Sequence, residues 1–281
     1  MMTEAGTVTE AGTVTAETDE KEILTEIRDG VCIITFNRPQ ARNAVTSTMA
    51  LAYAAALRAA DDDPQVRAIV VTGAGAGFCA GADLAVLRDG AEAIKKFVPA
   101  REDLPALTMR LRKPVIAAVN GAAVGIGFAY MMGSDIRIAA ESAKIATAFS
   151  RLGLAAEYGV SWLLPRAIGL QPALDLLLTG RTIGAQEAAK LGLIQQVVPD
   201  GTVLEAAVAY AKDLVENCSP FSLAMIKEQV YLDLDRSQDD ALTDTLRRMD
   251  IAFEGPGLAE ALTARTEKRP AVFDALPTRE A

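Results

Sequence analysis

The sequence predicts an α/β protein in which strands and helices alternate up to about residue 200, after which amphipathic helices follow one another. The first observation behind this prediction is an uncharged stretch between Lys113 and Asp135, in which an apolar run, a group of glycines and a second apolar run follow in order. A second stretch, which begins at Val66, has the same order of residues. The third observation is that no strand-like segment follows Pro199-Asp-Gly201.

The first predicted element is a β-hairpin. Residues 23–27 and 31–37 alternate apolar and polar side chains on either side of Asp29-Gly30, a dipeptide that is typical of a tight turn. Residues 46–60 are rich in alanine and predict a helix soon after the hairpin.

The stretch after Lys113 is long enough to span a membrane, but its residues favour a buried strand and helix. A proline, an asparagine and four glycines interrupt it. We predict a strand over 115–119, a turn at Asn120-Gly121 and a helix that opens near Gly127. Gly125 and Gly127 let the backbone approach a ligand closely, and the first N–H groups of a helix have no partners inside it.

The unit that begins at Val66 has the same design. Residues 66–72 predict a strand, glycines between positions 73 and 77 form a loop, and the segment 78–84 enters a helix. If the strands of the two units are adjacent and parallel, their loops meet at one end of the sheet. Two backbone N–H groups, one from each loop, can then point at one oxygen atom. This arrangement is an oxyanion hole, which stabilises negative charge that develops on a carbonyl oxygen.

The remaining elements follow from apolar periodicity. Residues 85–112 form a helical segment of mixed charge that is placed to shape a substrate pocket. Three further helices and one strand are predicted before residue 200, over 159–168, 172–178, 185–191 and 194–198. Three amphipathic helices are then predicted over 203–217, 219–232 and 239–253. Their apolar faces must pack either on the body of the protein or on a neighbouring subunit.

Composition excludes several classes of function. The 281 residues carry a net charge of −9 without a basic groove, which argues against nucleic-acid binding. There is no histidine, which excludes Ser-His-Asp triads and most catalytic zinc sites, so we expect no metal. Cys32, Cys79 and Cys218 are scattered and odd in number, which favours a reduced, cytoplasmic protein. We also expect no membrane contact.

The first residues are expected to form a disordered acidic tail. The sequence Thr-Glu-Ala-Gly-Thr-Val is repeated at 3–8 and 9–14, and eight acidic but only two basic residues lie among the first 30. Residues 1–20 have no apolar periodicity, so nothing drives them into a core. They also lack the apolar core and basic flank of a signal peptide.

Neither glycine loop matches a nucleotide-binding motif. Gly73-Ala-Gly75 would need a glycine at position 78, where the chain has Phe78, and Gly125-Ile-Gly127 would need one at position 130, where it has Tyr130. No Gly-Lys-Ser or Gly-Lys-Thr follows either loop, so a phosphate-binding P-loop is also unsupported. An oxyanion hole fits both loops better.

Four segments together resemble the crotonase superfamily, the enoyl-CoA hydratases and isomerases. They are residues 78–84, 118–127, 134–139 and 163–169, which read FCAGADL, AVNGAAVGIG, SDIRIA and LLPRAIG. The resemblance implies a ClpP/crotonase-like spiral of ββα units over residues 21–200 and a C-terminal helical region, residues 201–281, that builds homotrimers or dimers of trimers. It implies no cofactor, since coenzyme A is part of the acyl-CoA substrate.

The resemblance also assigns catalytic groups. The two oxyanion donors fall on the backbone N–H groups of Ala82 and Ile126. The paired glutamates of the hydratases align with Ala129 and Phe149, neither of which can transfer a proton. Glu157 remains, in a segment that resembles the single-base members, the Δ3,Δ2-enoyl-CoA isomerases and the ring-opening isomerases of phenylacetate breakdown. The alternative for Glu157 is a surface glutamate favoured by the start of the next helix.

Substrate contacts follow from the same resemblance. The residues expected to line the acyl-CoA site are Ala80, Asp83, Leu84, Gly125, Phe149 and Trp162. Asp83 also has the position of a helix cap. Arg38, Arg42 and either Lys268 or Arg269 are candidates to meet the phosphates of coenzyme A, with ordinary charged surface as the alternative.

The resulting hypothesis is an enzyme that shifts the double bond of a 3-enoyl-CoA to give a 2-enoyl-CoA. One carboxylate takes the proton from C2 and returns it at C4, while the oxyanion hole holds the enolate. Two alternatives remain open: addition of water to a 2-enoyl-CoA, and a non-catalytic protein that only binds acyl-CoA.

Overall fold

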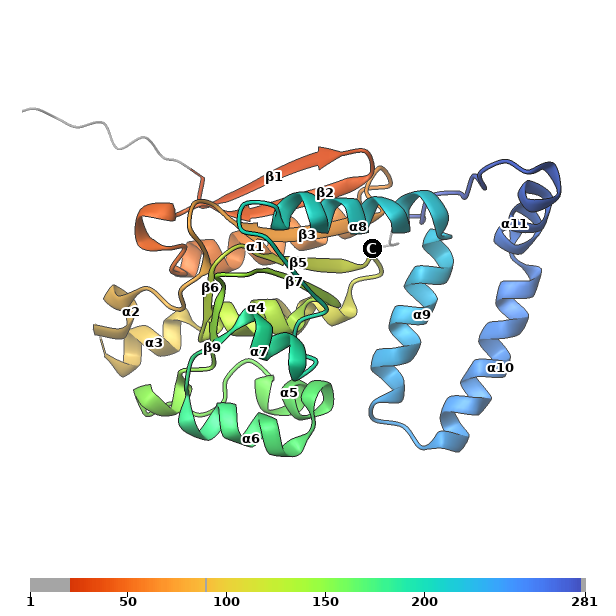
Figure 1. Ribbon diagram of the computed structural model, residues 1–281. Helices are drawn as coiled ribbons and strands as arrows, with labels where there is room; N and C mark the ends of the chain where they lie inside the picture. The colour runs from red at the N-terminus through yellow and green to blue at the C-terminus, as the bar shows by residue number, and fades with distance from the viewer. Residues whose placement is uncertain (1–20, 89, 279–281) are drawn as a thin grey trace, which may run out of the picture.

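The structure is a computed structural model, which describes residues 21–88 and 90–278 apart from five side chains between positions 84 and 94. The predicted tail, residues 1–20, lies outside the described residues. Two sheets with their helices form a body, from which the last helices extend to one side (Figure 1). The predicted α/β class is therefore confirmed.

The larger sheet contains six strands in the order β1-β2-β3-β5-β7-β10. Their bounds are β1 Ile23–Arg28, β2 Val31–Phe36, β3 Ala68–Gly73, β5 Val115–Val119, β7 Ile136–Ala140 and β10 Gln196–Val198. β1 and β2 form the predicted antiparallel hairpin, and the other neighbouring pairs are parallel. Val70 of β3 pairs with Ile116 of β5, which confirms that the strands of the two glycine units are adjacent and parallel.

A second sheet of short strands is a feature that no sequence pattern predicts. Its order is β4-β6-β8-β9, with bounds Gly77–Cys79, Ala122–Val124, Lys144–Ala146 and Ile183–Gly184. Strands of two or three residues are too short to show a periodicity. β4 and β6 follow β3 and β5 directly, so each glycine unit steps from the first sheet to the second. Gly121 permits this step, since a Cβ there would lie 2.1 Å from the carbonyl oxygen of Ala76.

Helices cover both faces of the larger sheet. Those before residue 200 are α1 Ser47–Asp62, α2 Leu84–Arg88, α3 Ala91–Phe97, α4 Ile126–Gly133, α5 Val160–Ile168, α6 Leu170–Thr179 and α7 Ala185–Lys190. One apolar core joins Ile69 and Val71 to α1 and α4, and a second joins Val70 and Ile116 to α8, Val203–Asn217. Because β3 and β5 are covered on both faces, they read as continuous apolar runs.

The last helices are α9 Pro220–Asp233, α10 Gln238–Glu254 and α11 Pro256–Glu267. The predicted helices over 203–217, 219–232 and 239–253 are confirmed, whereas α11 was not expected. α9 is anchored to the body by the buried Lys227, whose Nζ donates to Asp135 Oδ2 at 2.6 Å and to the carbonyl oxygen of Lys113. α10 packs mainly against α9 and α11 (Figure 1). Within the described chain, no helix has both the length and the apolar character needed to cross a membrane.

Candidate active site

The segments that contain Gly81 and Gly125, one from each glycine unit, meet at the carboxyl ends of β4 and β6. These strands are parallel neighbours, with Gly77 opposite Ala122. A Cβ added at Gly125 would lie 3.9 Å from Gly81 Cα, so the backbones of the two segments approach each other closely. The two units therefore converge as expected, but through the segments that follow β4 and β6, whereas the predicted loop over 73–77 connects β3 to β4.

Ala82 lies in a short strand-like segment whose neighbours are both hydrogen-bonded. It forms an isolated parallel bridge with Val45. The Val45 N–H donates to the Gly81 carbonyl at 2.8 Å, and the Asp83 N–H donates to the Val45 carbonyl at 3.0 Å. Successive N–H groups of an extended chain point to opposite sides, so the N–H of Ala82 points away from Val45. No residue in the described part of the chain accepts a hydrogen bond from it.

Ile126 is the first residue of α4. Gly125 precedes it with φ 57° and ψ −118°, a conformation that favours glycine. The Gly125 N–H donates to Ala146, and the first bond inside the helix runs from the Ala129 N–H to the Gly125 carbonyl at 3.1 Å. The N–H of Ile126 therefore has no acceptor within the helix or elsewhere among residues 21–88 and 90–278.

Glu157 lies in the turn that leads into α5. Its carbonyl oxygen accepts the Val160 N–H at 3.1 Å, and the next two residues, Tyr158 and Gly159, both have positive φ, of 57° and 78°. Tyrosine seldom adopts this conformation, which costs roughly 1 kcal/mol or more. The side chain of Glu157 is half-buried, and this burial raises the pKa of its carboxyl above the ordinary value.

Apolar side chains occupy positions 129 and 149, which the resemblance aligns with the glutamates of the hydratases. Ala129 and Phe149 are 2% and 3% exposed and belong to the main core. Burial raises the pKa of Tyr158, and the nearby carboxylate of Glu157 raises it further. Burial also raises the pKa of Tyr130 of α4, with a smaller contribution from Tyr158. The turn that contains Glu157 and Tyr158 therefore lies near α4. The positive φ of Tyr158 could be suspected from the sequence only because Gly159 follows it.

Arg38 and Asp83, both predicted to contact substrate, contact each other. Arg38 Nη1 lies 2.9 Å from Asp83 Oδ2, and Arg38 Nε lies 3.2 Å from Glu22 Oε1. Asp83 Oδ1 also accepts the Ala85 N–H at 3.0 Å, which confirms the predicted helix cap. Arg42 is exposed and forms no ion pair with any described residue. The guanidinium group of Arg38 is therefore paired with two carboxylates, whereas that of Arg42 is exposed to solvent.

The other predicted contact residues are spread more widely. The Ala80 N–H donates to the Arg42 carbonyl at 3.1 Å, which places Ala80 beside the loop that follows β2. Leu84 begins α2, and its side chain lies outside the described residues. Trp162 of α5 stacks under Arg166, with the guanidinium carbon 4.1 Å from the ring centroid. Lys268 ends α11, on the opposite side of the molecule from α2 (Figure 1), so it does not join the glycine loops within one chain.

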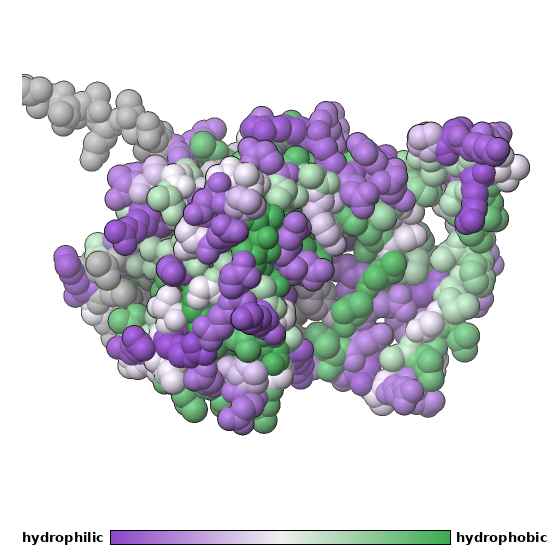
Figure 2. Space-filling model, in the orientation of Figure 1, coloured by the Kyte–Doolittle hydropathy of each residue, from purple (hydrophilic) through white to green (hydrophobic). Residues whose placement is uncertain are grey.

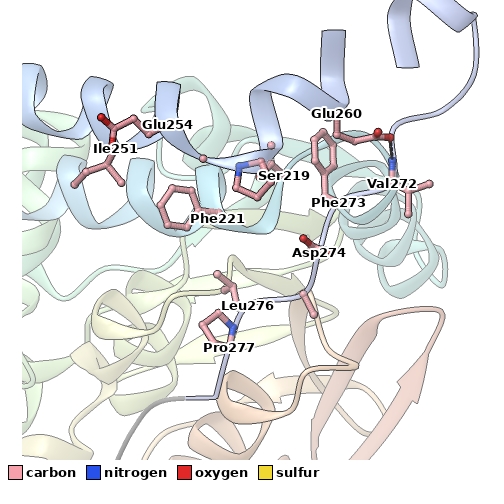
Figure 3. Close-up of a pocket in the computed structure, with 14 residues that line it drawn as sticks. Ser219, Phe221, Ile251, Glu254, Glu260, Val272, Phe273, Asp274, Leu276 and Pro277 are labelled. Carbon is pink, nitrogen blue, oxygen red and sulfur yellow. Dashed lines mark hydrogen bonds between the residues drawn. The ribbon is translucent and has the colours of Figure 1, made fainter. Parts of the chain in front are cut away.

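Two cavities lie around the C-terminal helices, the first among α9, α10, α11 and the segment that follows α11. One, of about 400 Å³, is lined by Phe221, Phe273 and Glu260 among others, and Figure 3 shows Glu260 accepting the Val272 N–H. The other, of about 710 Å³, shares Phe221 with the first and lies between α9, α10 and residues 106–112. Figure 2 shows hydrophobic side chains gathered over α9 and the lower part of α10. Within the described residues, no cluster of cysteine and acidic side chains could hold a metal ion.

Comparison with known proteins identifies the family. The sequence profile described as "Enoyl-CoA hydratase/isomerase" matches residues 26–275. The chain is 38% identical to the 1,2-epoxyphenylacetyl-CoA isomerase of Escherichia coli K12, over 89% of this chain and 97% of the relative. It is 34% identical to the probable enoyl-CoA hydratase EchA12 of Mycobacterium tuberculosis H37Rv, over 88% and 90% of the two chains.

Solved structures agree with this result. The crystal structure of a probable enoyl-CoA hydratase/isomerase from Mycobacterium abscessus superposes with a TM-score of 0.86 at 35% identity, and the match covers 91% of this chain and 99% of the other. The crotonase-type fold expected from the sequence is therefore confirmed, with its paired short and long strands and its C-terminal helices. This chain belongs to the enoyl-CoA hydratase/isomerase family of the crotonase superfamily.

Proposed function

We propose that the protein shifts a carbon–carbon double bond in an acyl-CoA thioester, from a 3-enoyl-CoA to a 2-enoyl-CoA, with Glu157 as the single proton carrier. The observation that carries this proposal is the half-buried carboxylate of Glu157, whose pKa is raised by burial, in a chain with apolar residues at positions 129 and 149. Glu157 forms no ion pair with the described residues, so its carboxylate is available as a base. Coenzyme A is part of the substrate, and no cofactor takes part.

The N–H groups of Ala82 and Ile126 hold the thioester oxygen. The bond between C2 and its hydrogen breaks, the proton moves to Glu157, and the electron pair is delocalised over the dienolate onto that oxygen. Glu157 then returns the proton to C4, and the double bond lies between C2 and C3. Each donor lowers the barrier by about 2.7–4 kcal/mol, because the oxygen gains charge only as the proton leaves.

A raised pKa suits this role. A base that must also give its proton back works best when its pKa lies close to the working pH. The burial of Glu157 disfavours the ionised carboxylate and so moves its pKa in that direction. Phe149 is a buried apolar residue, so position 149 does not supply a second acid.

Replacement of Glu157 by Gln tests the assignment. The amide cannot carry the proton, so we expect turnover of 3-hexenoyl-CoA to fall about 10³-fold, with acyl-CoA affinity retained. The matched control is Glu141→Gln, which alters an exposed glutamate and should leave the rate unchanged. Turnover by the Glu157→Gln variant equal to that of the wild type would refute the role of Glu157.

Two other functions are outcomes of the same assay. Several relatives are named enoyl-CoA hydratases, which favours water addition as the second candidate. Formation of a 3-hydroxyacyl-CoA from crotonyl-CoA, with no isomerisation of 3-hexenoyl-CoA, would support it. Saturable binding of both thioesters without conversion would instead identify a non-catalytic acyl-CoA-binding protein.

The chain is also proposed to form a homotrimer or a dimer of trimers. On α10, Leu242, Leu246, Met249 and Phe253 are 43–64% exposed and lie on one face at helical spacing. An apolar stripe of this length is normally covered in a stable protein.

In such an assembly, Lys268 of one chain contacts the coenzyme A bound to another chain. Arg42 is the candidate phosphate contact within the chain. Light scattering should give a mass of three or six chains, and Leu246→Glu should lower it.

A further inference from the structure

A group of three charged side chains surrounds the segment that contains Ala82. We call Glu22, Arg38 and Asp83 the Arg38 clamp. Arg38 Nη1 donates to Asp83 Oδ2 at 2.9 Å and to the carbonyl oxygen of Ala44, while Arg38 Nε lies 3.2 Å from Glu22 Oε1. The clamp therefore joins three separate parts of the chain: the residue before β1, the loop after β2, and the loop after β4.

The clamp holds both edges of the Ala82 bridge. Ala44 directly precedes Val45, and Asp83 directly follows Ala82, so Arg38 binds one residue on each side of the bridge. The two bridge hydrogen bonds lie between these anchors, at 2.8 and 3.0 Å. A rotation of the peptide plane before Ala82 would have to break one of these bonds. The direction of the Ala82 N–H is thus fixed by the bridge, and the Arg38 clamp holds the residues on either side of that bridge.

The carboxylates of the clamp are engaged elsewhere as well. Asp83 caps α2 through the Ala85 N–H, and Glu22 accepts from the hydroxyl groups of Thr46 and Thr48, at 2.8 and 2.6 Å for Oε2. The Arg38 and Asp83 side chains are each only 20% exposed. Their bond is therefore better shielded than a typical surface ion pair. Arg38, which is paired with two acids, is poorly placed to attract a phosphate as well.

We propose that Arg38 and Asp83 are positioning residues, which orient the Ala82 N–H toward the thioester oxygen without touching the substrate. This inference rests on the proposed function, because the amide acts only if an acyl-CoA carbonyl lies in the site. It assigns to both residues a role in transition-state stabilisation. It also leaves Arg42, in the loop after β2, as the arginine that is available to contact coenzyme A.

The test uses the full chain and two variants that remove the clamp in different ways. Asp83→Ser loses the bond to Arg38 but keeps a helix-capping oxygen, and Arg38→Gln removes the guanidinium. We expect each to lower kcat about 10- to 100-fold with KM within about threefold, since a misdirected donor loses part of its stabilisation. Arg38→Lys, which keeps one charged donor, should recover part of the rate.

A spectroscopic probe separates positioning from general structural damage. 4-(Dimethylamino)cinnamoyl-CoA absorbs at longer wavelength when its carbonyl oxygen accepts strong hydrogen bonds. Bound to the wild type it should show this red shift, and bound to either variant at saturation it should show less than about half of it. The matched control is Asp175→Asn, which removes a similar bond of 2.8 Å to Arg181 and should leave the shift unchanged.

The possible outcomes distinguish the two proposals. An unchanged red shift and kcat in Asp83→Ser and Arg38→Gln, while the wild type isomerises 3-hexenoyl-CoA, would overturn the positioning role alone. A wild-type red shift that the variants lose, without turnover of any enoyl-CoA, would support the clamp and refute the proposed isomerisation. A lower thermal midpoint in the variants with a full red shift would show that the clamp serves stability only.

Discussion

The two halves of the candidate oxyanion hole are built in different ways. The N–H of Ala82 lies in a backbone bridge to Val45, which the partly exposed charged side chains of the Arg38 clamp flank. The N–H of Ile126 is oriented by the backbone alone, because it opens a helix whose residues are all buried. A Cβ at Gly127 would lie only 2.1 Å from the Cys79 carbonyl, so the helix start is pressed against β4.

This difference has consequences for how each donor responds to change. A donor held by close packing has almost no freedom, and any added atom must move the backbone. A donor held by partly exposed charged groups can be altered by substitution, salt or pH while the fold survives. We therefore expect damage to the Ile126 side to appear as lost stability, and damage to the Ala82 side to appear first as lost activity.

The largest effect should come from Gly127→Ala. Its methyl group would collide with the Cys79 carbonyl, so β4 and α4 could not keep their contact, and we expect a loss of about 3 kcal/mol in the free energy of unfolding. Urea denaturation measures this loss. Gly184→Ala is the matched control, because no atom lies within 4 Å of the added Cβ and the φ is negative. Equal stability of the two variants would contradict the close packing.

Gly81→Ala should have the next largest effect. Gly81 has a φ of +113°, which an alanine adopts only with strain of about 1–3 kcal/mol, and its Cβ would lie 3.3 Å from the Val124 carbonyl. The segment would relax by turning the next peptide, so we expect kcat to fall at least about tenfold even where the protein remains folded. Steady-state kinetics on 3-hexenoyl-CoA, together with circular dichroism, check this result. A stable variant with full activity would weaken the comparison.

The pH dependence tests the base that both donors serve. Glu157 must be ionised to accept the proton, and burial raises its pKa, so activity should fall on acidification at a higher pH than for an exposed glutamate. The folded state also binds this proton more tightly than the unfolded state, so its stabilising effect is present at low pH and is lost as pH rises through the raised pKa. Glu157→Gln should therefore be at least as stable as the wild type at neutral pH, which calorimetry measures.

Salt should produce the smallest effect, and only on the Ala82 side. Raising the salt concentration from about 0.05 to 0.5 M screens the partly exposed Arg38–Asp83 pair, so we expect kcat at saturating substrate to fall less than about threefold. In Asp83→Ser, which lacks the pair, kcat should not depend on salt. An equal salt dependence in both proteins would show that the clamp does not act on the donor.

Long buried segments were predictable from the sequence. The strand over 115–119 coincides with β5, and the helix over 203–217 coincides with α8, because both have strong apolar patterns of adequate length. The four strands of the second sheet were not, since each has two or three residues and is defined only by its partner. α11 was also missed: it begins at Gly255-Pro256, and its charged and apolar residues show little helical periodicity.

The candidate site was predictable to a similar degree. Ala82, Ile126 and Glu157 could be named from the motifs, and the contact between Gly81 and Gly125 agrees with the expected convergence of the loops. The partner of Arg38 could not be named, because Asp83 lies 45 residues away and no periodicity links the two. The contact of Trp162 with Arg166 was within reach of the sequence, because residues four apart on a predicted helix are neighbours, but the face of α5 that turns outward was not.

The sequence by itself determined the fold class, the family and the apolar residues at positions 129 and 149, because these depend on residue types and on their order along the chain. Only the tertiary structure decided that Arg38 is held by Asp83, that the loops meet through β4 and β6, and that Lys268 lies far from them in one chain. The physical reason is that hydrogen bonds and ion pairs between distant residues depend on three-dimensional proximity, which leaves no periodic signal in the order of the residues.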